Sequence, residues 1–142
     1  MAEKKKNKKQ DIQEITLLLK KVQADFENYQ KRSEKEKQDF VEYSSQNTIT
    51  ELLPILDSFD HALKHSDNKD IKALYDQLWN LLSSKGLEKI KALDKKFDPY
   101  LHEALMQEKS DKEEGIVLEE LQTGYKFKDN VIRPTKVKVS GK

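Results

Sequence analysis

Cysteine is absent from the 142 residues. That absence excludes a disulfide scaffold, a thiolate zinc site and a cysteine nucleophile. No apolar run approaches the roughly 18 residues that span a bilayer. The N-terminus is basic, with a lysine run at Lys4–Lys9, but no hydrophobic segment of the signal-peptide type follows it. We therefore expect a cytoplasmic protein without a membrane segment.

Glycine and proline are scarce, with only 4 and 3 residues, against a usual combined share of about 12%. Charged residues make up 37% of the chain and are balanced, 27 basic to 26 acidic, for a net charge of +1. Few turn-forming residues and many balanced charges predict long, exposed helices in an oligomer. The near-neutral charge argues against a nucleic-acid binder, and residues 1–11 are interpreted as a disordered basic tail.

Residues 12–50 contain neither proline nor glycine and carry a heptad seam. Steps of four and three residues from Ile15 meet mostly apolar or aromatic side chains, which is typical of helices that pair. The segment is therefore predicted to form a coiled-coil stalk helix. The seam is weak at Ser33 and Glu36, whose polar side chains offer little to bury. The stalk residues expected to dimerise are Ile15, Leu19, Val22 and Phe26.

Residues 51–86 contain the most apolar stretch and predict a helical hairpin. Pro54 should kink the first helix or mark a restart, Asn68 should cap the second helix, and Gly86 should end it. One hairpin cannot cover its own apolar faces, so two hairpins from a dimer should form a four-helix bundle. The residues expected at this dimer contact are Leu52, Leu53, Leu56, Phe59, Leu63, Leu74 and Leu78.

After Gly86 the hydrophobic period changes from helical to alternating. Residues 87–142 are therefore predicted to form a small β-domain of short antiparallel strands. The expected fold class is α+β: a paired-helix stalk, a hairpin of a dimeric four-helix bundle, and a C-terminal β-domain.

Two groups of residues that contain histidine resemble chemical sites, and both are incomplete. His61 and His65 have the spacing of metal ligands, but a zinc site needs three or four ligands, so solvent-facing polar residues are the better interpretation. His102 and Glu103 have no nucleophile motif or glycine-rich phosphate loop nearby. His102 is interpreted as a structural group that closes a turn. We expect no metal, no cofactor and no catalysis.

The C-terminal half carries a long pattern of mixed residue types, formed by Phe97, Asp98, Pro99, His102, Ala104, Gly124, Tyr125, Asp129, Ile132, Arg133, Pro134 and Val137. Its order and spacing resemble the signature of the GrpE family, the nucleotide-exchange factors of DnaK-type chaperones. Upstream, Asp25–Arg32 and Glu51–Leu63 also resemble that family. Thr135 departs from the pattern, because the family prefers a smaller residue or valine there.

The resemblance implies a homodimeric co-chaperone of the stress response that works in a cycle with a DnaJ-type protein. One β-domain would wedge against the chaperone's nucleotide-binding domain and open its cleft. ADP would leave, ATP would rebind and the client protein would be released. Leu121, Asn130 and Val139 fall where family members touch the chaperone, and Asn28 and Arg32 in the stalk would give secondary contacts.

The weak seam at Ser33 and Glu36 fits a stalk that melts early on warming, which this family links to heat sensing. The main alternative is a non-enzymatic coiled-coil adaptor that only dimerises and tethers partners. Such an adaptor explains residues 12–82 but gives no reason for the composite pattern beyond Phe97.

Overall fold

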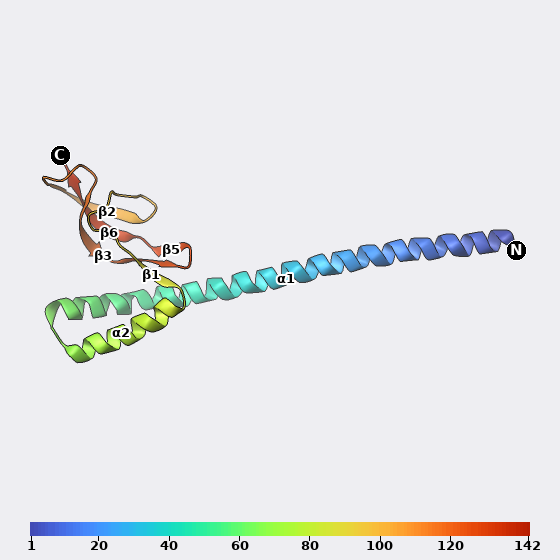
Figure 1. The fold of residues 1–142 in the computed structure, drawn as a ribbon, viewed down its shortest axis with the longest axis horizontal. Helices are drawn as coiled ribbons and strands as arrows, with labels where there is room; N and C mark the ends of the chain where they lie inside the picture. Colours follow the sequence, from blue (N-terminus) through green and yellow to red (C-terminus); the bar gives the residue numbers. More distant parts are fainter. The chain divides into compact units, whose positions relative to one another are not determined.

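The computed structural model describes residues 1–142 as two units, Met1–Ser44 and Ser45–Lys142. Helix α1 (Ala2–His65) provides the first unit and the start of the second, and helix α2 (Lys69–Ser84) and six strands complete the second (Figure 1). Neither helix is long and apolar enough to cross a membrane. The predicted α+β class is confirmed.

The first unit is a helical segment without a core of its own. Residues 2–11 are helical and run on into the predicted stalk, where the sequence was expected to be disordered. The stretch has no proline or glycine, and lysine is a good helix former, so nothing in it ends the helix. The stalk residues Ile15, Leu19, Val22 and Phe26 are each more than half exposed.

Helix α1 passes through Pro54 as one uninterrupted element up to His65, so the expected restart does not occur. A proline inside a helix removes one backbone hydrogen bond. Here Leu53 and Leu56, on either side of it, are both buried. Their packing offsets the loss of that bond.

The predicted ends of α2 are confirmed. The Asn68 side chain accepts hydrogen bonds from the backbone N–H groups of Asp70 and Ile71. Gly86 follows the last turn with a φ of +108°, a left-handed conformation that glycine adopts without steric cost.

The strands form two three-stranded sheets. The first contains β1 (Leu87–Ile90), β4 (Gly124–Phe127) and β5 (Asn130–Arg133) in the order β1-β4-β5, all antiparallel. The second contains β2 (His102–Lys109), β6 (Thr135–Gly141) and β3 (Val117–Gln122) in the order β2-β6-β3.

Strands β2 and β6 pair in parallel, so the expectation of an entirely antiparallel β-domain is wrong. Parallel neighbours need a long crossover connection, and here β3, β4 and β5 lie between them in the chain. Strand β1, directly after α2, was not predicted, because its four residues are too short to display a period.

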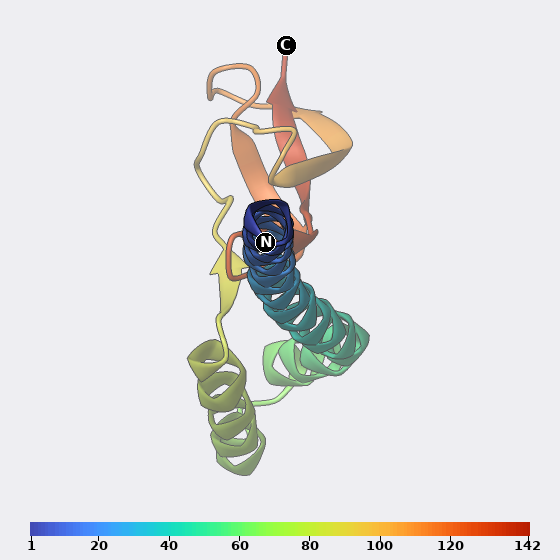
Figure 2. The same cartoon turned by 90° about the vertical axis from the view of Figure 1, so that its right-hand side faces the viewer.

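The larger core joins the helical hairpin to the first sheet. It consists of Ile49, Leu53, Leu56, Tyr75, Leu82, Leu87, Tyr125 and Phe127. In both views the strands lie on one side of the hairpin (Figures 1 and 2). One apolar face of the hairpin is thus covered by its own chain.

This core corrects two of the expected dimer contacts. Leu53 and Leu56 are only 2% and 0% exposed in the single chain. Neither side chain can therefore contact a second copy of the chain. A smaller core of Ala92, Val117 and Val137 lies in and beside the second sheet.

Candidate functional site

The β-strands are fastened to α1 by a polar cluster that we call the Asp57 clip, formed by Asp57, Gln122, Thr123 and Arg133. The Arg133 guanidinium donates to both carboxylate oxygens of Asp57, over 2.7 and 2.6 Å. It also donates to the Thr123 carbonyl from Nε (3.1 Å) and Nη2 (2.6 Å). Gln122 Nε2 donates to Asp57 Oδ2 over 3.2 Å. A two-pronged contact of this kind fixes both distance and orientation.

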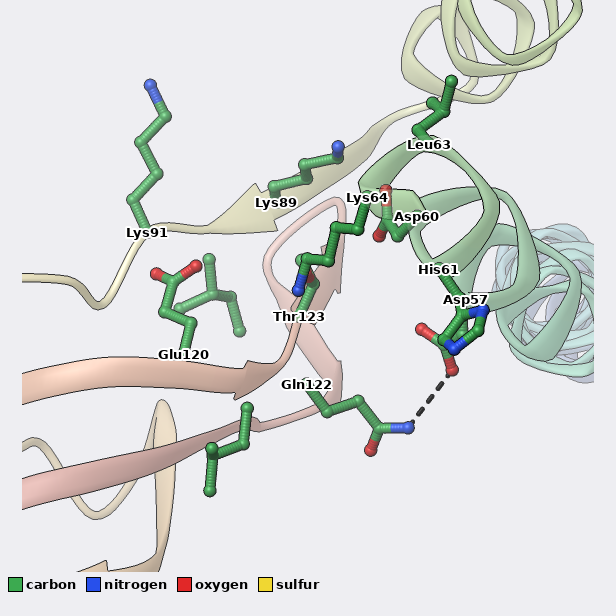
Figure 3. A pocket seen from close by; sticks show the side chains of 12 residues that line it. Asp57, Asp60, His61, Leu63, Lys64, Lys89, Lys91, Glu120, Gln122 and Thr123 are labelled. Atoms are coloured by element: carbon green, nitrogen blue, oxygen red, sulfur yellow. Dashed lines mark hydrogen bonds between the residues drawn. The ribbon is translucent and has the colours of Figure 1, made fainter. Parts of the chain in front are cut away.

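A cleft of about 690 Å³ opens beside the clip. Figure 3 shows Asp57, Asp60 and His61 of α1 on one side of the cleft, and Lys89, Lys91 and Glu120 on the strand side. Acidic and basic groups are mixed, so the cleft selects no single charge. Leu121 also lines the cleft and keeps 37% of its surface exposed.

The three β-domain residues for which the resemblance implies a chaperone contact differ in exposure. Asn130 is exposed, and its amide donates to Gln46 Oε1 of α1 over 3.4 Å. Leu121 is partly exposed beside the cleft. Val139 is half-buried and packs against the smaller core, so its side chain is not simply an outward-facing contact.

The predicted turn around Asp98 is present, and His102 closes it. The Asp98 carbonyl accepts from the backbone N–H of Leu101 (3.1 Å) and of His102 (2.8 Å). In return the Asp98 N–H donates to His102 Nδ1 over 3.0 Å. The His102 ring lies 6.0 Å from that of Phe97.

His102 is a buried ring held by one hydrogen bond to its Nδ1. It is 4% exposed, and its Nε2 has no hydrogen-bond partner. Burial lowers the pKa of His102, because a buried cation loses hydration. Since Nδ1 accepts from Asp98, the bonding assigns the proton to Nε2.

Gly124 and Thr135 join the two sheets at one close contact. A Cβ on Gly124 would lie 2.3 Å from the Thr135 nitrogen, so only glycine fits. The Thr135 hydroxyl accepts from the Gly124 N–H (3.1 Å) and donates to the Ile90 carbonyl (3.2 Å). The hydroxyl that valine lacks is therefore used twice.

Tyr125 is completely buried, between the Trp79 ring (6.1 Å) and the Arg133 guanidinium (5.4 Å). Its hydroxyl has no hydrogen-bond partner, and burial raises its pKa. Tyr75 also has a raised pKa through burial; its hydroxyl accepts from Lys89 Nζ, which lies 4.9 Å from the Tyr75 ring and 4.8 Å from the Trp79 ring.

One lysine links all three strands of the second sheet. Lys138 Nζ on the central strand β6 lies 2.9 Å from Glu119 on β3 and 3.0 Å from Glu108 on β2. These hydrogen bonds to Glu119 and Glu108 raise the pKa of Lys138.

The remaining signature residues lie in strands and connections. Val137 is buried in the smaller core, and Ile132 packs against the larger one. The others are Pro99 in the turn after Asp98, Ala104 on β2, Asp129 between β4 and β5, and Pro134 between β5 and β6.

The stalk residues belong to the first unit and are exposed there. Arg32 Nε lies 3.9 Å from Glu36 Oε1, and its guanidinium is 5.9 Å from the Tyr29 ring centre. Asn28 is exposed.

His61 and His65 stack with ring centres 4.3 Å apart. His65 Nδ1 is 2.8 Å from the His61 carbonyl oxygen. No group of three or more His, Cys, Asp or Glu side chains has the geometry to hold a metal ion.

The sequence interpretation missed Asp57 and its partner Gln122 as parts of the site. Asp57 lies within the stretch Glu51–Leu63 that resembles the family, but no role was predicted for it. A usable signal was present: Asp57 lies about three turns beyond Gln46 and on the same face of α1 as Leu53. An acidic residue on a buried apolar face calls for a cationic partner.

These features define a class of protein: a helical scaffold with an exposed apolar seam that presents a small, firmly attached β-domain. A family model described as GrpE matches residues 1–141. The chain is 48% identical over 131 residues to Protein GrpE of Bacillus subtilis (strain 168), which covers 86% of this chain and 70% of that protein. Protein GrpE of Bacillus pumilus (strain SAFR-032) is 47% identical over 129 residues, covering 84% and 70%.

Protein GrpE of Methanothrix thermoacetophila (strain DSM 6194 / JCM 14653 / NBRC 101360 / PT) is 44% identical over 123 residues, covering 86% of this chain and 68% of that protein. The chain belongs to the GrpE family. That family consists of nucleotide-exchange co-chaperones of DnaK-type chaperones, which act in the stress response and are not catalytic enzymes in the usual sense. The resemblance found in the sequence is confirmed.

Proposed function

We propose that this protein acts as a cytoplasmic homodimer that opens the nucleotide-binding domain of a DnaK-type chaperone. One β-domain wedges against a lobe of that domain, ADP leaves, ATP rebinds and the client protein is released. The cycle includes a DnaJ-type co-chaperone. The chain itself performs no bond chemistry.

Exposed apolar surface on the hairpin supports the dimer. Ile55, Leu74 and Leu81 are 48%, 58% and 58% exposed in the single chain. An apolar groove of about 230 Å³ is lined by Ile55, Ser58, Phe59, Ala62 and Ile71 from α1 and α2. A second hairpin laid on this face would complete a four-helix bundle. Leu52, Phe59, Leu63 and Leu78 are only partly buried, so they stay in the proposed contact.

The stalk seam supports pairing in the same way. Ile15, Leu19, Val22 and Phe26 repeat at heptad spacing and are more than half exposed, and burying apolar area yields about 25 cal/mol per Å². Asn28 and Arg32 on this helix are proposed to give secondary contacts to the chaperone. The polar positions Ser33 and Glu36 are proposed to let the stalk unwind first on warming, which would serve as a heat sensor.

The observation that carries the chaperone contact is Leu121. It is a partly exposed leucine beside a cleft, and the next residue, Gln122, is bonded to Asp57 of α1. An apolar side chain on a rigid support loses little conformational freedom on binding and gains free energy when its exposed surface is buried by a partner. Asn130 and Val139 are proposed to add to this contact.

The mechanism requires only a difference in affinity. The β-domain must bind the open chaperone more tightly than the closed, ADP-bound one, and each 1.4 kcal/mol of that preference shifts the population about tenfold. By linkage, ADP must weaken the binding of this protein to the chaperone by the same factor.

The test is the release of labelled ADP from a DnaK-type chaperone with and without this protein. Leu121→Asp should abolish most of the acceleration, because a carboxylate cannot be buried in an apolar contact. The matched control is Leu105→Asp. Leu105 is 51% exposed and lies on β2, the opposite edge strand of the sheet that contains Leu121. This control should leave the acceleration of ADP release intact. Helix content by circular dichroism should be unchanged in both. If the unaltered protein does not accelerate ADP release, the adaptor interpretation replaces this one.

A further inference from the structure

We infer that Asp57 is a positioning residue for nucleotide exchange. Through Arg133 and Gln122 it holds the segment Leu121–Thr123 in a fixed orientation on α1, and that orientation gives the protein its preference for the open chaperone. The inference rests on the proposed contact of the β-domain with the nucleotide-binding domain.

Two kinds of contact attach the strands to α1, and they do different things. The larger core, with Leu53 and Leu56 against Tyr125 and Phe127, supplies a non-directional attraction. Close packing in this core holds the β-domain against α1. Each apolar contact is non-directional by itself, so directional hydrogen bonds add to the definition of its angle.

The Asp57 clip supplies the direction. Two parallel hydrogen bonds join Arg133 to Asp57, and two more join the same guanidinium to the Thr123 carbonyl. The bond from Gln122 occupies Asp57 Oδ2 as well. A planar guanidinium with its donors used on both sides cannot rotate without losing several bonds at once.

The clip lies where the proposed wedge needs support. Gln122 and Thr123, which it holds, directly follow Leu121 in the chain. The side chains of Arg133 and Asp57 are only 18% and 28% exposed, so water screens their attraction less than that of a surface pair. A side-chain hydrogen bond from Asn130 to Gln46 of α1, at 3.4 Å, also joins the two parts and involves no charge.

Loss of the fixed orientation of the β-domain should reduce its preference for the open over the closed chaperone. A β-domain that can tilt would follow the chaperone lobe as it closes, and would then bind both states about equally. A ligand with equal affinity for two states shifts neither, however tightly it binds. The variant should therefore still bind the chaperone and fail to open it.

The experiment measures two dissociation constants for each variant with a DnaK-type chaperone, without nucleotide and with saturating ADP. For the unaltered dimer the ratio of the two should be large. Asp57→Asn, which keeps the shape and loses the charge, should reduce that ratio about tenfold, equivalent to about 1.4 kcal/mol. Maximal ADP release should fall in parallel. A purely structural role would not change the ratio, because a partly unfolded population weakens both affinities by the same factor.

Three further variants complete the design. Asp57→Glu keeps a carboxylate and should restore part of the ratio. Arg133→Lys keeps the charge but loses the two-pronged geometry, so it should reduce the ratio and serves if Asp57→Asn does not fold. Lys112→Gln removes an exposed ion pair with Asp94 that does not involve α1 and should behave like the unaltered protein.

The two proposals fail differently. If the unaltered protein neither binds the chaperone nor accelerates ADP release from it, the proposed function is wrong. If the unaltered protein does bind the chaperone and accelerate ADP release, but both Asp57→Asn and Arg133→Lys keep the full ratio of dissociation constants with and without ADP, the proposed function stands. The positioning role of Asp57 is then overturned.

Discussion

The two units of this chain differ in how much of their apolar surface is buried within one chain. In Met1–Ser44 the apolar side chains from Ile12 to Tyr43 are all more than half exposed. In Ser45–Lys142 the same kinds of side chain form two cores, and Leu56, Leu87 and Tyr125 are completely buried. A single helix has one stripe and nothing to cover it, whereas a hairpin with two sheets covers part of its own surface.

In the proposed dimer, the two units should therefore respond differently to pairing. The second unit has two cores within one chain, so dimerisation should affect its stability less. The first unit has no core within one chain, so we expect its stability to depend on the proposed pairing.

The largest expected effect is at Leu56, which the structure moves from the dimer contact to the core of the second unit. Leu56→Asp buries a carboxylate without a partner and should cost about 4 kcal/mol or more. Most of the stability of the second unit should be lost. Trp79 packs against this core, so its fluorescence during urea unfolding reports the change.

The matched control is Leu74→Asp on the exposed face of α2, where the leucine is 58% exposed. It should weaken the dimer in sedimentation and leave the Trp79 transition nearly intact. If Leu56→Asp instead dissociates the dimer while the fluorescence transition is unchanged, the assignment of Leu56 to the core is wrong.

The second prediction concerns the stalk. Ser33→Leu combined with Glu36→Leu fills the weak part of the seam, and each buried leucine adds about 1.5–3 kcal/mol. Loss of the exposed Arg32–Glu36 pair (3.9 Å) costs little. Circular dichroism should show two helical transitions in the unaltered protein, with only the lower one raised in the variant.

A control at two outward positions, Lys31→Leu with Glu34→Leu, should leave the lower transition where it was. A single transition that neither pair of changes moves would contradict separate melting of the stalk.

The third prediction concerns the contact between the two sheets. Thr135→Val leaves the buried Gly124 N–H and Ile90 carbonyl without their partner, which should cost about 1–3 kcal/mol. Thr135→Ser keeps the hydroxyl and should cost less. Urea midpoints of the Trp79 transition compare them, and a valine variant as stable as the unaltered protein would show that shape alone decides this position.

The smallest expected effect is a dependence on pH. Burial lowers the pKa of His102 in the folded chain, so between its folded and unfolded values the unfolded chain binds more protons. The stability is therefore full above the unfolded pKa of about 6.5, and it falls as the pH drops through that value toward the lower folded pKa. Protonation would also place two donors, Asp98 N–H and Nδ1–H, against each other.

His102→Asn offers a side-chain acceptor in place of Nδ1 and does not titrate. The urea midpoint of the unaltered protein should drop between pH 7 and pH 5 by more than that of the asparagine variant. Equal drops would assign the acid sensitivity to other groups.

The elements that could be predicted from the sequence are those with a local cause. Heptad spacing, a capping Asn68 and a left-handed Gly86 act within a few residues, so the two helices and both ends of α2 were predicted correctly, whereas the start of α1 at Ala2 was not. The signature from Phe97 to Val137 identified the family, and the turn closed by His102 was predicted from its neighbours in the chain.

The packing partners of the helices and strands could be read only from the three-dimensional fold. Leu53 and Leu74 look equivalent on amphipathic helices, yet one is buried under a sheet and the other is exposed, because burial depends on strands some seventy residues farther along the chain. The parallel pairing of β2 with β6 and the ion pair of Asp57 with Arg133 have the same origin. Each joins segments distant in sequence, and no local periodicity carries that information.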